Sequence, residues 1–99
     1  MQNIPRYAGM VWYRRDDWEK LRAIFADSHV LPDTYDQWLQ KAEDGYRRFK
    51  GGGTIVEKVY IDPETFPDWC RNRGLDIDAN ARTAFSSEMV RRKYIKTDG

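Results

Sequence analysis

The chain has 99 residues and a formal net charge of +1, which is enough for a single domain with one core. Such a charge provides no general attraction to nucleic acid, anionic lipid or acidic substrates, so a partner of that kind would need a local patch. Because Cys70 is the only cysteine and His29 the only histidine, an internal disulfide and a zinc site with the usual Cys/His spacing are excluded. We expect neither a metal nor a cofactor.

The first half of the sequence predicts a strand followed by two helices. Residues 7–13 (YAGMVWY) favour a strand, and residues 15–28 carry apolar side chains at helical spacing. The clearest helical pattern covers residues 32–53, where apolar residues recur three and four positions apart. Thr34 and Gln37 form a capping-box pattern at its start.

The second half begins with a predicted strand at residues 54–62 (TIVEKVYID), in which apolar and polar residues partly alternate. A shorter helix is expected within residues 63–74 (PETFPDWCRNRG), with Asp62 as a good N-cap. Because Pro67 fits poorly inside that helix, the helix can instead begin near Pro67, after a turn. Gly74 supplies a left-handed stop.

A final helix is predicted over residues 76–95, begun by Asp76 or Asp78. Its expected apolar face is made of Ala81, Ala84, Phe85 and Met89, with Ile95 as a further member.

These elements predict an α+β fold with two short antiparallel strands and about four helices, in the order β-α-α-β-α-α. The strands are expected to be antiparallel because a pair of helices between them returns the chain to the point where the first strand ended. We expect one domain spanning residues 1–99, with flexible ends at about residues 1–5 and 95–99. The strand edges have no obvious protection, so pairing with a second copy of the chain is plausible.

The glycine run Gly51–Gly53 raises the question of a phosphate-binding loop. Such loops lie between a strand and a helix, where free N–H groups point toward the anion. Here the glycines follow a helix and precede a strand, so they lie beside carbonyl groups and negative partial charge. A helix stop with a connector explains the run better than a nucleotide site does.

Most of the charge fits helix stability, since acids open the predicted helices and bases close them. Two groups of neighbouring basic and aromatic residues are not explained in this way. Near the C-terminus, cations surround Tyr94, and after the first strand Arg14 and Arg15 follow Trp12 and Tyr13. Cations contact phosphates and aromatic rings stack on bases, so weak binding of single-stranded nucleic acid is one hypothesis. The cations around Tyr94 are Arg91, Arg92, Lys93 and Lys96.

Catalysis has less support in the sequence. Cys70 as a nucleophile and His29 as a base are the only candidates for an activity. A lone cysteine beside Trp69 is usually a small core residue, and His29 lies in a loop where a solvated imidazole is common. We therefore expect no enzymatic activity, although a reaction based on Cys70 and His29 is not excluded.

The aromatic content of 14% is high for one small core, and exposed aromatic and arginine side chains are typical of interfaces. The sequence therefore predicts a small interaction or regulatory domain that acts through a protein partner or a homodimer. Nucleic-acid binding through the basic–aromatic tail is the alternative. No apolar segment resembles a signal peptide or a membrane span, so a cytoplasmic location is expected. The candidate partner-binding residues are Tyr7, Tyr13, Arg14, Arg15, Tyr60, Arg91, Arg92, Lys93 and Tyr94.

Overall fold

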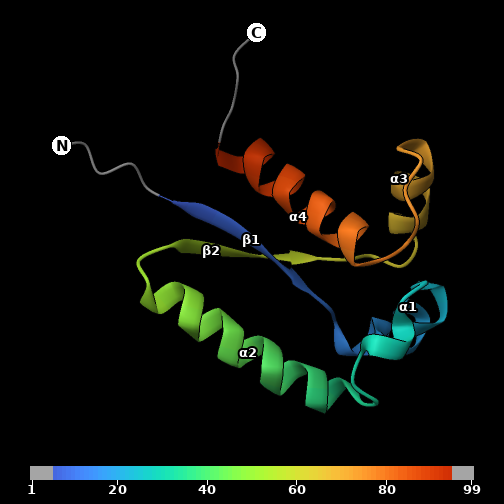
Figure 1. The fold of residues 1–99 in the computed structure, drawn as a ribbon, viewed down its shortest axis with the longest axis horizontal. Coiled ribbons are helices and arrows are strands. Elements are labelled where there is room, and N and C mark those ends of the chain that lie inside the picture. The colour runs from blue at the N-terminus through green and yellow to red at the C-terminus, as the bar shows by residue number, and fades with distance from the viewer. Residues whose placement is uncertain (1–5, 95–99) are drawn as a thin grey trace, which may run out of the picture.

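The computed structural model describes residues 6–94, which form two strands and four α-helices (Figure 1). Short 3-10 helices precede and follow the first α-helix, η1 (Arg15–Asp17) and η2 (Ser28–Val30). The expected flexibility of residues 1–5 and 95–99 concerns positions outside the described residues. In chain order the main elements are β1 (Tyr7–Trp12), α1 (Trp18–Ile24), α2 (Tyr35–Gly51), β2 (Ile55–Tyr60), α3 (Phe66–Asn72) and α4 (Ala79–Tyr94).

The two strands are parallel, so the prediction of an antiparallel pair is wrong, and the β-α-α-β-α-α order holds only roughly. Tyr7 aligns with Ile55 and Trp12 with Tyr60. The prediction assumed that the helices expected over residues 15–28 and 32–53 together return the chain to the end of the first strand. With 7 residues α1 rises only about 10 Å, whereas the 17 residues of α2 rise about 25 Å. One long helix brings the chain back to the start of β1, and β2 must then run in the same direction as β1.

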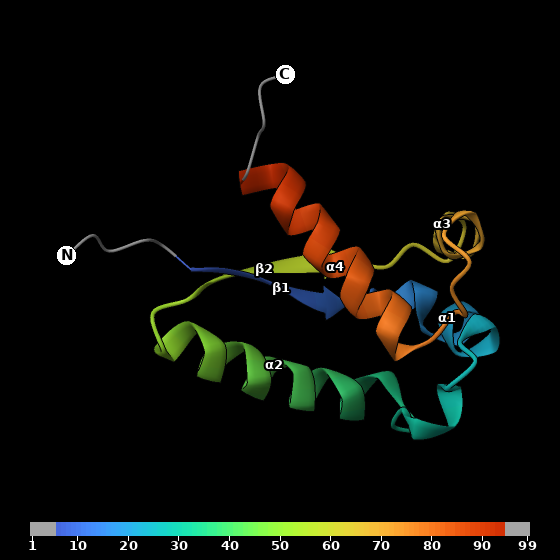
Figure 2. The same cartoon turned by 45° about the horizontal axis from the view of Figure 1, so that its top comes forward.

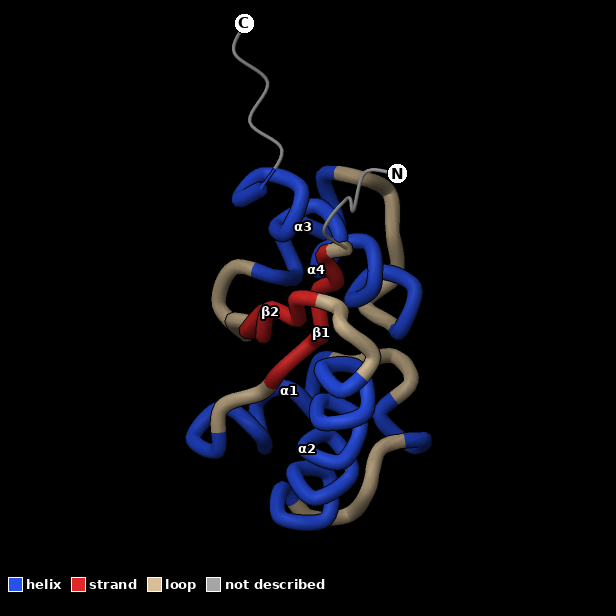
Figure 3. The backbone as a smooth tube through the Cα atoms, turned by 90° about the vertical axis from the view of Figure 1, so that its left-hand side faces the viewer, coloured by secondary structure: helices blue, strands red, loops and turns tan. Residues whose placement is uncertain are grey.

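The helices cover both faces of this sheet, with α2 on one face and α4 on the other (Figures 2 and 3). A Cβ atom at Gly9 would lie 2.2 Å from Ser86 Oγ, so α4 crosses β1 in direct contact with its backbone. On the opposite face, Met10 contacts α2 at Gly45. Parallel strands are normally covered on both sides, and this sheet follows that rule.

The ends of α2 lie where its sequence signals place them. The Thr34 side chain accepts a hydrogen bond from the N–H of Gln37 (3.1 Å), and the Gln37 side chain accepts one from the N–H of Thr34 (3.2 Å). The predicted capping box is therefore confirmed. After α2, Gly53 adopts φ +85°, a left-handed conformation that permits the turn into β2.

The other predicted helix signals are also realised. A turn in which the N–H of Thr65 donates to the carbonyl of Asp62 (3.3 Å) precedes α3, so the later of the two expected starts is correct. Gly74 has φ +66° and ends α3 as predicted. For α4, the carboxylate of Asp78 accepts from the N–H of Ala81 (3.1 Å), which identifies Asp78 as the cap.

The buried face of α4 differs from the predicted one. Ala84 is exposed, whereas Arg82 and Ser86 are buried. Arg82 is buried because its guanidinium forms two hydrogen bonds with the carboxylate of Asp27, at 2.8 and 2.9 Å. Ser86 is buried because its backbone and side chain meet Gly9. Two polar residues at core positions thus hide the helical period from a hydrophobicity pattern.

The main core lies beyond the carboxyl ends of the strands, where α1, α3 and the beginning of α4 meet (Figure 1). Leu21, Ile61 and Cys70 have 0% exposure, and aromatic rings fill most of the remaining space. The core cluster comprises Tyr13, Trp18, Leu21, Phe25, Ile61, Phe66, Cys70 and Ala81.

Candidate interaction surface

The peptide groups of β2 alternate between β1 and the outer edge of the sheet. The N–H of Ile55 donates to the carbonyl oxygen of Arg6, at 2.8 Å. In a parallel pair every second residue of a strand bonds to the same neighbour, so the residues between them face the other way. Val56, Lys58 and Tyr60 therefore turn their peptide groups toward the outer edge. Such an edge can accept another strand.

A hollow of about 300 Å³ opens along this outer edge, between β2 and α4. It exists because α4 lies mainly over β1, which leaves part of β2 uncovered on the α4 face. Phe85 and Met89 line it from the helix, and both are only partly buried. The remaining lining residues are Glu57, Lys58, Val59, Tyr60, Val90 and Lys93.

The opposite face of the same edge carries two cations that rest on aromatic rings. Lys58 Nζ lies 4.2 Å from the ring centroid of Trp12 and 4.8 Å from that of Tyr46. The Arg14 guanidinium carbon lies 4.4 Å from the ring centroid of Tyr60. Within residues 6–94, neither cation forms an ion pair with a carboxylate. Both are therefore held in place while their charge stays uncompensated.

A second hollow, of about 510 Å³, lies beside β1, on the other side of α4. Tyr7 and Tyr94 form one end of it and stack with ring centroids 4.0 Å apart. The hydroxyl of Tyr94 donates to the carboxylate of Glu57, and Lys93 Nζ lies 3.1 Å from the same carboxylate. The hydrogen bond from Tyr94, together with a smaller contribution from Lys93, lowers the pKa of Glu57.

Among the cations predicted around Tyr94, the three within residues 6–94 do not form one cationic surface. Lys93 is paired with Glu57, and Arg92 lies 3.6 Å from the carboxylate of Glu88. Arg91 lines the hollow beside β1 instead. The Tyr94 ring is already stacked on Tyr7, so it does not offer a free face for a base on that side. Lys96 lies outside the described residues.

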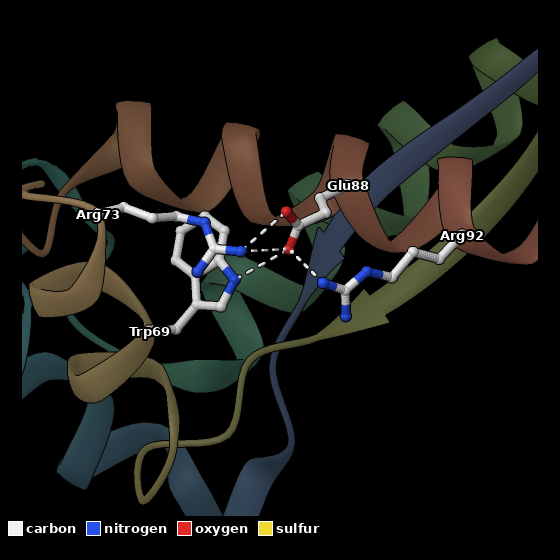
Figure 4. Close-up of polar contacts among 4 residues, drawn as sticks. All are labelled: Trp69, Arg73, Glu88 and Arg92. Atoms are coloured by element: carbon white, nitrogen blue, oxygen red, sulfur yellow. Dashed lines mark hydrogen bonds and ion pairs between the residues drawn. The ribbon is translucent and has the colours of Figure 1, made fainter. Parts of the chain in front are cut away.

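Glu88 also ties α3 to α4 (Figure 4). Trp69 Nε1 donates to it at 3.0 Å and Arg73 at 2.9 Å, while the Arg73 guanidinium lies 4.2 Å from the centroid of the Trp69 ring. The hydrogen bond from Trp69, together with Arg73 and Arg92, lowers the pKa of Glu88. These contacts assign Arg92 to a structural cluster.

The remaining candidate residues lie at the carboxyl ends of the strands. The six residues of β1, about 20 Å in length, separate them from the stacked rings of Tyr7 and Tyr94. Tyr13 is 3% exposed and its carbonyl oxygen accepts from the hydroxyl of Tyr35, so Tyr13 belongs to the core and offers a partner no surface. Arg15 pairs with Asp36 at 2.7 Å. Arg14 and Tyr60 remain exposed and in mutual contact.

The two residues considered for catalysis are in different environments. Cys70 is fully buried, and desolvation raises the pKa of its thiol, which disfavours the nucleophilic thiolate. His29 is exposed in the 3-10 helix η2. Residues 6–94 contain no group of three or more His, Cys, Asp and Glu side chains that is arranged to hold a metal ion.

Lys58, Phe85 and Met89 were not among the predicted partner-binding residues. The sequence pattern places Phe85 and Met89 on the apolar face of a helix and Lys58 within a strand. A lysine in the middle of a strand is a typical feature of an unpaired edge, so Lys58 carried a usable signal. The hollow itself depends on where α4 crosses the sheet, which no local pattern reveals.

The fold is a two-stranded parallel sheet covered by helices on both faces, with an open outer edge on β2. A family model described as "Domain of unknown function (DUF8829)" matches residues 2–96, and the chain belongs to this family. No curated protein and no solved structure matches the chain. Among the helices within residues 6–94, none has the length and apolar character required to cross a membrane.

Proposed function

We propose that the chain is a small interaction or regulatory domain without catalytic activity, and that it acts through a protein partner or a second copy of itself. The observation that supports this most is the outer edge of β2. There, a partly apolar hollow lies together with peptide groups and two cations that have no partner within residues 6–94. Recognition by strand addition uses backbone hydrogen bonds for affinity and side-chain pockets for specificity, and this edge offers both.

A cytoplasmic location belongs to the same proposal and rests on the sequence features given above. Fractionation of cells that produce the tagged chain tests it. Recovery of the chain in the soluble cytoplasmic fraction is the expected result.

Nucleic-acid binding remains the alternative function. It rests on Arg14 beside Tyr60 and on Arg91, which forms no ion pair within residues 6–94. Against it, Tyr94, Arg92 and Lys93 are engaged in contacts within the chain. An Arg91→Ala variant that keeps the same nucleic-acid affinity and the same dependence on salt would rule out its assigned role.

Affinity purification from a lysate of the native host, with and without nuclease, separates the two functions. We expect a specific protein that stays bound after nuclease treatment, or a molar mass that rises with concentration when the purified chain is measured alone. Elution of nucleic acid, or of proteins that disappear with nuclease, supports the alternative. A monomer that retains no protein contradicts the proposed function.

A further inference from the structure

We propose that the outer edge of β2 binds an extended segment of a partner protein in which apolar and acidic side chains alternate. The segment adds to the sheet as a third strand beside β2. Its apolar side chains face α4, and its acidic side chains face the α2 side. This inference rests on the proposed function and specifies the chemistry of the partner.

The backbone of β2 provides the main-chain groups that an added strand would bind. Val56, Lys58 and Tyr60 direct their peptide N–H and carbonyl groups away from β1. An extended segment satisfies these groups with main-chain hydrogen bonds whatever its sequence. Because side chains of a strand alternate between the two faces, the two faces of the edge then select the sequence pattern.

On the α4 face, the hollow selects apolar side chains. Val59 lies at its base and is 8% exposed, while Phe85 and Met89 form the wall on α4. Among the described residues that line the hollow, Glu57 is the only acid, and Lys93 at 3.1 Å compensates its charge. A side chain placed beside Val59 therefore meets mainly carbon atoms.

On the α2 face, Lys58 and Arg14 select acidic side chains. Both rest on rings and lack a carboxylate partner within the described part of the chain. The Lys58 ammonium is already positioned by Trp12 and Tyr46, so an incoming carboxylate has less side-chain freedom to remove than at an ordinary surface lysine. An acid opposite Lys58 is the cross-strand pair that β-sheets favour.

A second copy of the chain fits this edge less well. Two copies of β2 related by a two-fold axis pair in antiparallel fashion, and each residue at the centre of the pairing opposes itself. Centres at Glu57 and at Lys58 place like charges directly opposite each other, which destabilises the pairing. A centre at Val59 places Lys58 opposite Tyr60 and leaves the lysine without an acid.

The outer edge of β1 carries no charged residue from Tyr7 to Trp12, so it selects no charge pattern.

The test uses a short synthetic peptide of alternating valine and glutamate, titrated into the isotope-labelled full chain and followed by NMR. Saturable shifts at the amides of Val56, Lys58 and Tyr60 are expected. A Val56→Pro variant removes an outward N–H without touching the ladder to β1, and it should lower the affinity about tenfold. Tyr7→Pro is the matched control, because it removes an outward N–H from the opposite edge.

A charge reversal provides a readout that does not depend on proline being tolerated. The Lys58→Glu variant should lose affinity for the valine–glutamate peptide and gain affinity for a valine–lysine peptide. Shifts that map to β1, or equal binding of both peptides by the natural chain, would overturn the proposal. Protection of the β2 amides that rises with protein concentration in the absence of peptide would assign the edge to a second copy instead. If the peptide fails to bind while affinity purification still recovers a specific protein, the proposed function stands and this inference falls.

Discussion

Replacing Gly9 by alanine should destabilise the protein, because α4 crosses β1 at this residue. The added Cβ would lie 2.2 Å from Ser86 Oγ, 2.7 Å from Val90 Cγ2 and 2.8 Å from the backbone oxygen of Ser86. The hydroxyl can rotate away, but the backbone oxygen can move only if α4 moves. Overpacking of this kind costs about 3 kcal/mol at the upper end of its usual range. Alanine in a strand recovers about 0.5–1 kcal/mol relative to glycine, so the expected net loss is about 2 kcal/mol.

Urea unfolding followed by tryptophan fluorescence measures this loss. With a typical dependence of about 2 kcal/mol per molar urea, the unfolding midpoint should fall by about 1 M. Gly45→Ala is a matched control, since its new Cβ would meet only the mobile end of Met10, at 3.2 Å. That variant should stabilise the protein by about 0.5–1 kcal/mol, because alanine favours the helix.

A double variant tests whether the close contact with Ser86 causes the loss of stability in Gly9→Ala. Adding Ser86→Gly to Gly9→Ala removes the hydroxyl contact but keeps the contacts with Val90 and the backbone oxygen. Part of the loss should be recovered, as a coupling energy of at least about 0.5 kcal/mol. A Gly9→Ala protein as stable as the natural chain would refute the close crossing of α4 over β1.

Three further predictions concern stability and reactivity. Asp27→Asn should cost about 2 kcal/mol at pH 7, since it leaves the buried guanidinium of Arg82 without its carboxylate. The hydrogen bonds from Arg82 hold the pKa of Asp27 below its ordinary value of 3.8. The stabilisation by this ion pair is therefore fully present above pH 3.8, and it is lost as the pH falls through the lower, folded-state pKa. Urea titrations at several pH values should therefore show the difference between variant and natural chain shrinking in acid, and a constant difference would contradict the ion pair. Thr34→Ala should cost about 1 kcal/mol by calorimetry through loss of the capping box, whereas Thr83→Ala on the exposed side of α4 should not destabilise. Cys70 should react slowly with a thiol reagent at neutral pH and rapidly in urea, because burial both shields the thiol and raises its pKa; fast labelling of the folded chain would revive the catalytic hypothesis.

Part of the candidate surface was visible in the sequence. Arg14 and Tyr60 were predicted from their residue types, and both are exposed at the end of the strands. Tyr13 had the same residue type but is buried, since its position just after β1 points it into the aromatic core. Residue type indicates what a side chain can bind, whereas only packing determines whether it is accessible.

The sequence alone determined the helices, the strands and most of their ends. Thr34 with Gln37, Asp78 and Gly74 act on peptide groups a few residues away, so their effects do not depend on the rest of the fold. The direction of β2 depended on which of two helices runs back along the sheet. The buried face of α4 depended on contacts with Asp27 and Gly9, which are distant from it in the chain. The open edge of β2 has the same origin, because it exists only where α4 lies over β1 and leaves its neighbour uncovered. Local signals fix elements through hydrogen bonds between near neighbours, and the tertiary structure fixes direction and exposure through contacts between distant ones.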